Sequence, residues 1–308
     1  MRKKIFILGS YNVDIVTYLD RFPVPGESIA ATSSSTFPGG KGANQALAAS
    51  RSGGQVNFAV KVGQDAFGHN AERELPESPI ASLDIFVCDS KPTGKAMIMI
   101  NQSSGENIIT IDLGANAAFS ETDIDSLSDK IGDAGYFLTQ LENNWDATLK
   151  AIRIARNKGT TVILNPAPFS ENIMNVLDLI DIITPNETEA ELISGIKIET
   201  ATDAIQAARK IKSMGVKNIL ITLGAKGCVL VNDEFMGSLP VFPAKCVDTT
   251  GAGDSFNGAF VARLAAGDPI VDAAVYGSAF ASCATELMGA SSHPSLADVE
   301  SRLKSRVL

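Results

Sequence analysis

Histidine is nearly absent from this sequence: its 308 residues include only His69 and His293. Metal catalysis through histidine ligands and a Ser-His-Asp hydrolase therefore lack their usual components. C-x-x-C pairs are absent as well, because the four cysteines are scattered along the chain: Cys88, Cys228, Cys246 and Cys283. This spacing predicts buried free thiols in a reducing compartment and argues against disulfides or a zinc site.

Long apolar runs and clusters of basic residues are also missing. No apolar stretch approaches the roughly 20 residues that cross a bilayer, and the first strand-like run, Ile5–Leu8, is too short for a signal-peptide core. We therefore expect no membrane contact and a cytoplasmic location. The formal net charge is −9 without any Lys/Arg block, which predicts no nucleic-acid partner because phosphate neutralisation needs clustered cations. Binding of a small anionic ligand remains possible, since a few backbone amides and one lysine can hold it.

The sequence does contain regularly alternating short apolar runs and longer amphipathic stretches. The apolar runs are Ile5–Leu8, Asn57–Val62, Tyr136–Leu141, Thr161–Leu164, Asp181–Thr184, Asn218–Thr222 and Cys228–Val231. The amphipathic stretches include Trp145–Asn157, Thr202–Met214 and Ala252–Ala266. This alternation predicts an α/β fold with a mostly parallel sheet covered by helices on both faces. Such sheets bind ligands beyond the carboxyl ends of their strands.

Two segments interrupt the alternation. Tyr18–Phe37 has β-branched and small residues around Pro23-Val24-Pro25-Gly26 and no helical period. Lys95–Asn101 and Glu106–Asp112 are typical of two strands joined by a turn at Gly105. Together these segments predict a small separate sheet that emerges from the main domain.

The strongest local signal is the run Asp248-Thr249-Thr250-Gly251-Ala252-Gly253-Asp254, which leads into the helical stretch Ser255–Ala266. Its small residues allow backbone amides to approach a ligand, and the start of a helix adds positive potential for an anion. Asp254 could accept the proton of a hydroxyl that attacks a phosphoryl group. Taken alone, the run is explained better by an N-cap aspartate in a glycine-rich turn.

The run Gly39-Gly40-Lys41-Gly42-Ala43-Asn44-Gln45 opens another helical stretch. Three glycines around a lysine and an asparagine predict backbone contact with a polar ligand. The run is not a Walker A loop, because Ser35 and Gly42 stand where that loop needs Gly and Ser/Thr. A flexible loop with a solvated lysine is the alternative.

Three weaker signals follow other strands. Asn186 and Glu189 share a helical face and suit Mg²⁺ with its waters, but a capping box explains them equally well. The run Thr222–Gly227 ends a strand in a glycine turn that suits a nucleotide, although a plain β-turn would look the same. Asp14, after the first strand, could accept hydrogen bonds from sugar hydroxyls, but aspartates at such places are more often turn residues.

Taken together and in this order, these runs resemble the ribokinase-like carbohydrate kinase family over essentially the whole chain. The resemblance is carried by Asn12 with Asp14, Gly39–Asn44, Asn165–Pro168, Thr184–Glu189 and Asp248–Asp254. It implies a doubly wound, mostly parallel sheet flanked by helices, with a small β-sheet lid that closes over the sugar and pairs two subunits into a homodimer. The kinase domain would comprise residues 1–10, 38–91 and 113–308, and the lid residues 11–37 and 92–112.

The resemblance implies transfer of the γ-phosphoryl group of ATP to O5 of D-ribose, which gives ribose 5-phosphate. At matching positions, the sugar ligands would be Asn12, Asp14, Gly40, Lys41, Asn44 and Glu142. The ATP site would be lined by Asn186, Thr222, Gly224 and Gly227. The anion hole for the γ-phosphoryl group would be formed by Gly251, Ala252 and Gly253, with Asp254 as the catalytic base.

Two cations belong to the same family pattern. Glu189 would lie near Mg²⁺ and contact it through water. A monovalent cation, typically K⁺, would be bound mostly by backbone carbonyls of Asp248, Thr250, Ala284, Leu287 and Gly289. Either Ser292 or His293 matches the last ligand, because the spacing to the following proline departs from the family pattern.

Other functions stay open at this point. Asp14 and the Gly40–Asn44 loop are compatible with several polyols, so a kinase for 2-deoxyribose, fructose or a nucleoside is the nearest alternative. A non-catalytic sugar or nucleotide sensor with the same fold is a further alternative, against which the intact Asp254 and its glycine turn argue. A dehydrogenase is disfavoured, because no dinucleotide fingerprint follows the first strand.

Overall fold

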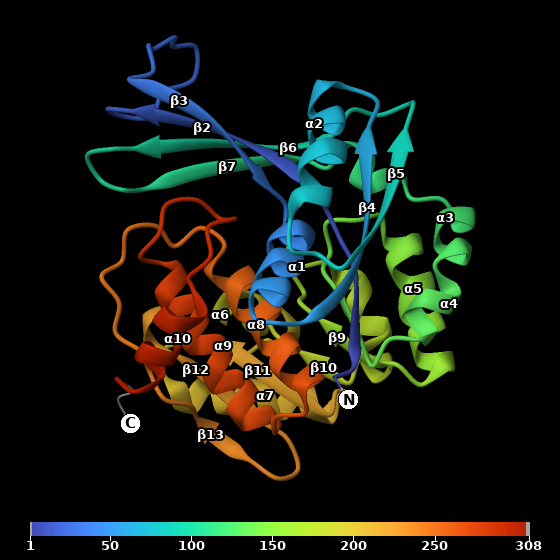
Figure 1. The fold of residues 1–308 in the computed structure, drawn as a ribbon. Coiled ribbons are helices and arrows are strands. Elements are labelled where there is room, and N and C mark those ends of the chain that lie inside the picture. The colour runs from blue at the N-terminus through green and yellow to red at the C-terminus, as the bar shows by residue number, and fades with distance from the viewer. Residues whose placement is uncertain (1, 306–308) are drawn as a thin grey trace.

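A nine-stranded sheet forms the centre of the molecule in the computed structural model, which describes residues 2–305 (Figure 1). In spatial order its strands are β13 (Met236–Ser238), β12 (Cys228–Val231), β11 (Asn218–Thr222), β10 (Ile182–Ile183), β9 (Thr161–Leu164), β8 (Tyr136–Thr139), β1 (Lys4–Leu8), β4 (Gln55–Gly63) and β5 (Ser82–Cys88). Neighbours from β11 to β5 pair in parallel, whereas β12 and β13 pair antiparallel at one edge. The predicted mostly parallel α/β sheet is confirmed.

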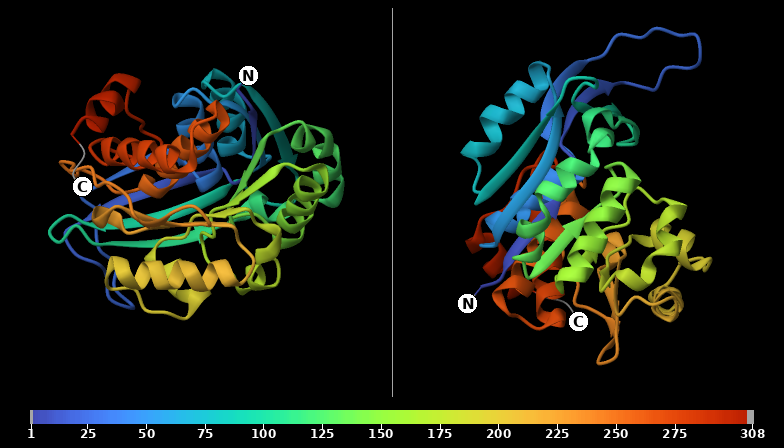
Figure 2. Two further views of the ribbon diagram at one scale, coloured as in Figure 1. Left: turned by 90° about the horizontal axis from the view of Figure 1, so that it is seen from below. Right: turned by 90° about the vertical axis from the view of Figure 1, so that its right-hand side faces the viewer.

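Strand β1 illustrates how the sheet is buried on both faces. Ile5 and Ile7 pack into one hydrophobic cluster, while Phe6 and Leu8 pack into the other. Alternating side chains of a strand point to opposite faces, so a run that is apolar throughout requires a helical layer on each side. Figure 2 shows these two layers with the sheet between them.

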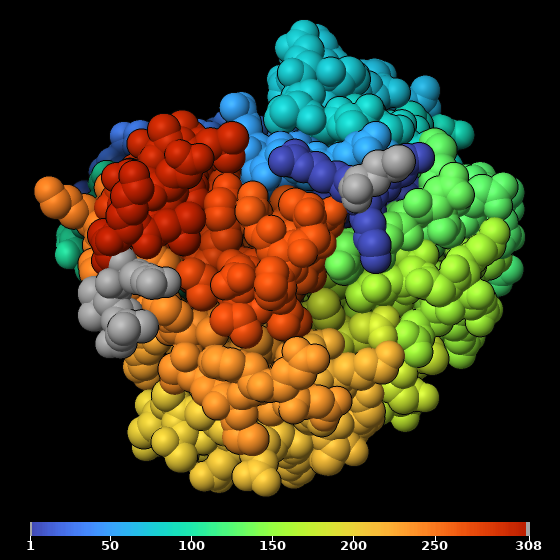
Figure 3. Space-filling view, turned by 60° about the horizontal axis from the view of Figure 1, so that its bottom comes forward, coloured from blue at the N-terminus to red at the C-terminus, as the bar shows by residue number. Residues whose placement is uncertain are grey.

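Helices on the two faces come from different parts of the chain. One face is covered by α1 (Lys41–Arg51), α2 (Ala66–Glu74), α8 (Ala252–Ala266) and α9 (Ile270–Ala284). The other is covered by α3 (Glu121–Ser126), α4 (Ser128–Gly132), α5 (Trp145–Lys158), α6 (Glu187–Ser194) and α7 (Ala201–Ser213). Helix α10 (Leu296–Leu303) packs on α9. The segments coloured yellow to red form most of the face seen in Figure 3, with α10 at its left edge.

A second, four-stranded sheet has the order β3 (Ser33–Gly39), β2 (Asn12–Leu19), β6 (Gly94–Asn101) and β7 (Asn107–Asp112). In Figure 1 it crosses above the C-terminal helices. The predicted small sheet is therefore present, but its composition differs in one respect. Strand β2, which pairs with β3 in antiparallel fashion, begins at Asn12, before the predicted segment Tyr18–Phe37, so Asn12 and Asp14 lie in a strand and not in a turn. The division of the chain into two domains remains a prediction.

Other predicted boundaries need smaller corrections. Strand β8 ends at Thr139, before the predicted end at Leu141, so Glu142 lies in a bend beyond the sheet. Strand β5 was not predicted because its sequence, SLDIFVC, carries an aspartate and is only half-buried at the sheet edge. Among residues 2–305, no helix has the length and apolar character needed to cross a membrane.

The order of strands locates the crevice where the site is expected. The chain leaves β1 and later pairs with it on one side through β4 and on the other through β8. At such a reversal of strand order, the connections after neighbouring strands diverge and leave space at their carboxyl ends. Ser10, after β1, and Glu142, after β8, both lie at this end and are in hydrogen-bond contact.

Candidate active site

The start of α1 is held close to the chain that follows β1. Gly40 precedes the helix with φ 93°, and a Cβ atom at this position would lie 2.6 Å from the backbone nitrogen of Asn12. Only glycine fits such a close approach at positive φ. The amide of Ala43 donates to the carbonyl of Ser10 at 2.9 Å. The glycine-rich run thus seats the α1 N-terminus against the start of β2.

A buried polar network connects Asn12 to Glu142. The Glu142 carboxylate accepts hydrogen bonds from the Ser10 hydroxyl and, at 3.1 Å, from the amide of Lys41. The Asn12 amide group reaches the same oxygen at 3.5 Å, and Asn116 donates to the Asn12 side-chain oxygen at 2.9 Å. Asn12 therefore has a single side-chain orientation, with its oxygen toward Asn116 and its N–H groups toward Glu142.

Asp14 is buried in β2 but accepts no hydrogen bond from any other residue between 2 and 305. Burial first, and then the nearby charges of Glu142 and Asp254, raises the pKa of Asp14 to about 7. A buried carboxylate without donors is costly, so it persists where a ligand supplies the missing hydrogen bonds. Hydroxyl groups of a polyol are donors of that kind.

Lys41 provides the positive charge among these carboxylates. Burial by itself would lower the pKa of its ammonium group, but attraction to acidic side chains outweighs burial and raises it. The acidic residues responsible are Asp254, Glu142, Glu189 and Asp14. Within residues 2–305, none of them forms an ion pair with Lys41. The Lys41 ammonium group is thus charged and lies among four acidic side chains, but it forms no ion pair with them among residues 2–305.

Asp254 lies in the first turn of α8 and is buried. Its carboxylate accepts hydrogen bonds from two neighbouring amides of α1, at 3.1 Å from Asn44 and at 2.9 Å from Gln45. Asn44 in turn accepts from the hydroxyl of Ser291 at 2.9 Å. The predicted base is therefore joined to one of the predicted sugar ligands, and N-capping does not explain it because Gly251 occupies the N-cap position.

The backbone before Asp254 is arranged for an anion. Gly251 has φ 73°, and a Cβ atom there would lie 2.7 Å from the carbonyl oxygen of Ala290. The amide of Ala252 already donates to Thr249 at 3.1 Å. By contrast, the amides of Gly253 and Asp254 donate to no acceptor within residues 2–305. Free amides at the start of a 15-residue helix favour bound negative charge.

The predicted nucleotide ligands lie on separate turns beyond β10 and β11. Asn186 and Glu189 form a capping box at the start of α6, with side-chain and backbone contacts of 2.9 to 3.0 Å. The backbone of Thr222 bridges to Asn186. Gly224 and Gly227 bound a short turn, both at positive φ, and Gly224 is exposed. The amide of Gly227 closes the turn by donating to the carbonyl of Gly224 at 3.1 Å, and the exposed Gly224 is accessible to a ligand.

The predicted monovalent-cation ligands come from two loops that Asp248 joins. Its carboxylate accepts from the amide of Thr250 at 2.9 Å and from the amide of Gly289 at 2.9 Å. The carbonyls of Ala284 and Gly289 accept within their own turns, from Leu287 and Ser292 respectively. Thr250 and Leu287 are exposed.

The two candidates for the last cation ligand point in different directions. The hydroxyl of Ser292 donates to the carbonyl of Met288 at 2.6 Å. The ring of His293 packs on Phe280 at 5.9 Å, and burial together with the charge of Arg51 lowers the pKa of His293 to about 4.

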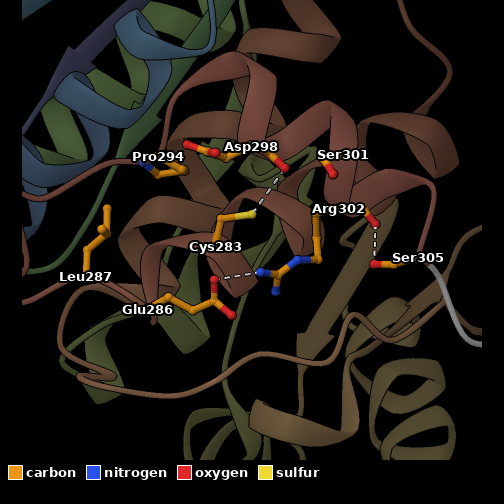
Figure 4. A pocket seen from close by; sticks show the side chains of 8 residues that line it. All are labelled: Cys283, Glu286, Leu287, Pro294, Asp298, Ser301, Arg302 and Ser305. Atoms are coloured by element: carbon orange, nitrogen blue, oxygen red, sulfur yellow. Dashed lines mark hydrogen bonds and ion pairs between the residues drawn. The ribbon is translucent and has the colours of Figure 1, made fainter.

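A cavity of about 440 Å³ lies between α9 and α10 (Figure 4). Arg302 of α10 crosses it: its guanidinium group donates to Glu286 at 2.7 Å, and also to the carbonyl of Pro243 at 2.7 Å. Glu286 accepts from the amide of Lys245 at 2.8 Å. This cavity adjoins the segment that leads into the Asp248–Asp254 turn but contains none of the predicted catalytic residues.

Several polar residues of the site were not predicted. They are Ser10, Gln45, Asn116 and Ser291. Gln45 had a usable signal, because it directly follows Asn44 in the glycine-rich run. The others contact the site across long separations in sequence, such as 105 residues from Tyr11 to Asn116, and no local pattern marks them.

Comparisons with known proteins agree with this arrangement. The model of the pfkB family carbohydrate kinases matches residues 2–296. Ribokinase of Haemophilus influenzae is 37% identical over 292 residues, which cover 95% of this chain and 95% of that protein. A bifunctional ribokinase/ribose-5-phosphate isomerase A of Fructilactobacillus sanfranciscensis is 38% identical over 263 residues, and the match spans 85% of this chain but 48% of that protein.

Two further similarities bear on the substrate. Deoxyribokinase of Salmonella typhi is 35% identical over 257 residues, which cover 83% of this chain and 84% of that protein. The structure of Arabidopsis thaliana ribokinase complexed with ribose and ATP aligns with a TM-score of 0.88 and 33% identity, and covers 99% of each chain.

Proposed function

The chain belongs to the pfkB family of carbohydrate kinases, and from this premise we propose that it transfers the γ-phosphoryl group of ATP to O5 of D-ribose. The observation that carries the proposal is the position of Asp254. Its carboxylate accepts a hydrogen bond at 3.1 Å from Asn44, one of the predicted sugar ligands. The residue before it, Gly253, has an amide without an acceptor among residues 2–305. An acceptor hydroxyl and a phosphoryl group brought to these two neighbours would meet at the base.

Each group then has a defined task. Asp14, Asn12 and Glu142 bind and orient the sugar hydroxyls. Asp254 takes the proton of the reacting sugar hydroxyl. The hydroxyl oxygen then forms a bond to the γ-phosphorus, while the bond from that phosphorus to the leaving oxygen of ADP breaks. The amides of Gly251, Ala252 and Gly253 form the proposed anion hole, in which the Ala252 amide would exchange its bond to Thr249 for one to the phosphoryl group. Lys41 adds positive charge, and most of the rate enhancement comes from positioning and electrostatic stabilisation.

Mg²⁺ fits this site as a companion of ATP. Among residues 2–305, no group of three or more His, Cys, Asp or Glu residues is placed to hold a metal ion, and both carboxylate oxygens of Glu189 already accept from Asn186. These features support contact through water, with the phosphates supplying the direct ligands, as is usual for Mg²⁺. The ion would neutralise charge on the phosphates.

K⁺ fits the two loops that Asp248 joins. The proposed ligands present oxygen atoms within these loops: Asp248, Thr250, Ala284, Leu287 and Gly289. Either Ser292 or His293 completes the proposed set. Oxygen ligands suit a hard cation, which would add positive charge beside the anion hole. Equal rates in K⁺ and in tetramethylammonium buffers would argue against this assignment.

A homodimer through the small sheet is the proposed assembly. The strands β6 and β7 expose a set of large apolar side chains with exposed fractions of 43 to 47%: Met97, Ile108, Ile109 and Ile111. Because side chains alternate along paired strands, Ile109 and Ile111 lie on one face of this sheet with Ala96 and Ile98, whereas Met97 and Ile108 lie on the other. A second copy would cover the face of Ile109 and Ile111, because exposed apolar surface of this kind marks an interaction face. Sedimentation velocity on the wild type and on Ile109→Lys tests this. Identical monomer profiles for both would refute it.

The function is tested by measuring ADP release with a panel of sugars and identifying the product by NMR. We expect D-ribose to be the preferred acceptor and phosphate to appear on O5. The similarity to a deoxyribokinase makes 2-deoxyribose the specific second candidate, and a strong preference for it over ribose would replace the first proposal. Absence of sugar-dependent ADP release across the panel would favour a non-catalytic sensor.

A further inference from the structure

Gln45 is a fully buried amide whose side chain makes three hydrogen bonds. Its side-chain nitrogen donates to a carboxylate oxygen of Asp254 at 2.9 Å and to the side-chain oxygen of Asn165 at 3.0 Å. Its side-chain oxygen accepts from Gln140 at 2.7 Å. The amide thereby uses both of its N–H groups and one acceptor site.

The orientation of this amide is determined by its neighbours. Asp254 and Asn165 each present an oxygen atom to Gln45, whereas Gln140 presents an N–H group. Rotating the amide by 180° would put its oxygen against those two oxygens and its nitrogen against a donor. Such a buried mismatch costs the full desolvation of every group left unpaired. Gln45 is thus locked as a donor to Asp254.

A chain of hydrogen bonds continues from Gln45 through Asn165, Thr184 and Asn257 to the residue before Asp254, and we call it the circuit. Asn165 donates to the carbonyl of Thr184 at 3.1 Å, and the Thr184 hydroxyl bonds to the side-chain oxygen of Asn257 at 2.6 Å. Asn257 donates to the carbonyl of Gly253 at 2.9 Å. Gly253 is the residue before Asp254, so the circuit begins at the carboxylate and ends on the adjacent backbone.

Every side chain of this circuit is buried and therefore immobile. Gln45 is 0% exposed, Thr184 and Asn257 are each 2% exposed, and Asn165 is 7% exposed. They come from α1, the ends of β9 and β10, and α8. A buried hydrogen-bond network of this kind rigidifies the groups that it contains. It links the orientation of the Asp254 carboxylate to the Gly253–Asp254 peptide unit, which follows the amide that would bind the phosphoryl group.

We propose that Gln45 is a positioning residue for the phosphoryl-transfer reaction, which fixes the Asp254 carboxylate relative to the Gly253–Asp254 peptide unit. This inference rests on the proposed function, because it assigns Gln45 a role through the proposed base. Gln45 does not contact substrate in this account. Its N–H group holds the carboxylate in one orientation, and its bond to Asn165 continues the circuit that reaches the Gly253 carbonyl.

The test is Gln45→Met, which keeps the length of the side chain but has no N–H donor. We expect the single-turnover rate at saturating D-ribose and ATP to fall roughly 10- to 100-fold, as misplacement of a reacting group does. The KM for ribose should change less than about threefold, since Gln45 acts on the transition state.

Gln140→Met is the matched control, because it also removes a buried amide but does not contact Asp254. It should lose less rate than Gln45→Met. A second readout is the double variant with Asp254→Asn, in which Gln45→Met should cause little further loss if it acts through the base. If Gln45→Met does not fold, Gln45→Glu carries the test, because it keeps the shape of the side chain and removes both N–H donors.

A wild-type rate in Gln45→Met would overturn the inference. So would a loss in Gln45→Met that is undiminished in the Asp254→Asn background. A near-normal rate in Asp254→Asn alone would instead refute the base assignment of the proposed function, so the two failures can be told apart.

Discussion

On the side of Asp254 formed by β2 and α1, the predicted sugar ligands Asn12, Glu142 and Asn44 are 2%, 3% and 4% exposed. On the side formed by the turns before α6, after β11 and before α8, Asn186, Gly224 and Thr250 are exposed. The first side is built from side chains that already hold one another by hydrogen bonds. The second presents mainly backbone groups of turns.

This difference indicates how each half of the site acquires its shape. Side chains that hold one another in a buried network, such as Asn12, Glu142 and Asn44, keep their positions without a ligand. The proposed sugar half is therefore largely pre-organised and should lose little entropy on binding. Exposed turns have fewer constraints and belong to the less stable parts of a fold. The nucleotide half therefore depends on its ligands and on its supports from outside the site.

One such support is visible in the structure. Thr285 at the end of α9 accepts from the amides of Val247 and Asp248 at 2.7 and 3.1 Å. Arg302 of α10 adds its bonds to the carbonyl of Pro243 and to Glu286. Helices α9 and α10 thus hold the segment that leads into the anion-hole turn.

The largest effect should come from the residue between the two halves. Asp254→Asn removes the proton acceptor but keeps a side chain of the same shape, so both substrates should still bind. We expect kcat to fall by roughly 10²- to 10⁴-fold, the usual contribution of general base catalysis, with KM values within a few-fold of the wild type. Steady-state kinetics checks this, and a kcat close to that of the wild type would remove the base from the account.

Asp14→Asn should weaken the sugar half alone. The neutral amide is a poorer acceptor for sugar hydroxyls, and we expect the ribose KM to rise roughly 10- to 100-fold, since hydrogen bonds to charged groups contribute about 1.5 to 3 kcal/mol. The KM for ATP should stay nearly constant. The variant should also unfold at a higher temperature at pH 8, because it removes a buried charge without donors. An equal rise of the KM for ribose and the KM for ATP would contradict the assignment of Asp14 to the sugar half alone.

Lower pH should reproduce part of that effect in the wild-type protein. Because the pKa of Asp14 is raised to about 7, the carboxylate is largely protonated at pH 6 and ionised at pH 8. We expect kcat/KM for ribose to fall by roughly tenfold between pH 8 and pH 6. The fall should be absent in Asp14→Asn, and a pH profile shared by both proteins would contradict the assignment.

The same shift predicts the direction of a stability change. The folded protein binds a proton at Asp14 up to about pH 7, whereas the unfolded chain releases it near pH 4. The stabilisation from this group is complete below the unfolded value and is lost as the pH rises through 7. Thermal unfolding of the wild type and Asp14→Asn should therefore diverge between about pH 4 and pH 7, the window that these two values define.

The smallest effect should come from the support of the nucleotide half. Arg302→Ala breaks the bonds to Glu286 and Pro243 and should raise the KM for ATP by roughly 3- to 10-fold, which corresponds to about 1 kcal/mol. The ribose KM should be unchanged. Arg156→Ala, which breaks the pair with Asp181 before β10, is the matched control and should affect neither KM. An equal rise of the ribose KM in Arg302→Ala would show that the halves are coupled.

Much of the fold was predictable because its strands are apolar throughout and its helices amphipathic. The edge strand β5 was missed since it is half-buried and carries Asp84. The segment Tyr18–Phe37 was correctly assigned to the small sheet, but the bounds of β2 and β3 were not predicted. In β3, small and polar residues such as Ser33–Ser35 are exposed, so the pattern of a buried strand is absent there.

The site was predictable where its residues cluster in sequence. Asp254, Asn44 and Lys41 stand in glycine-rich runs at helix starts, which mark places of close backbone approach. Asn116 and Ser291 could not be predicted, because their roles arise only when distant segments meet: Ser291 contacts Asn44 across 247 residues. The capping box at Asn186 shows that a local explanation and a functional one can describe the same residues.

Calorimetric titration of D-ribose into the nucleotide-free protein, in buffer without K⁺ or Mg²⁺, tests the central claim that the sugar half is complete before the nucleotide binds. We expect ribose to bind with an affinity within a few-fold of that measured in the presence of K⁺ and a non-hydrolysable ATP analogue, and Asp14→Asn to lose this binding. Ribose binding that requires the nucleotide or K⁺ would contradict the account.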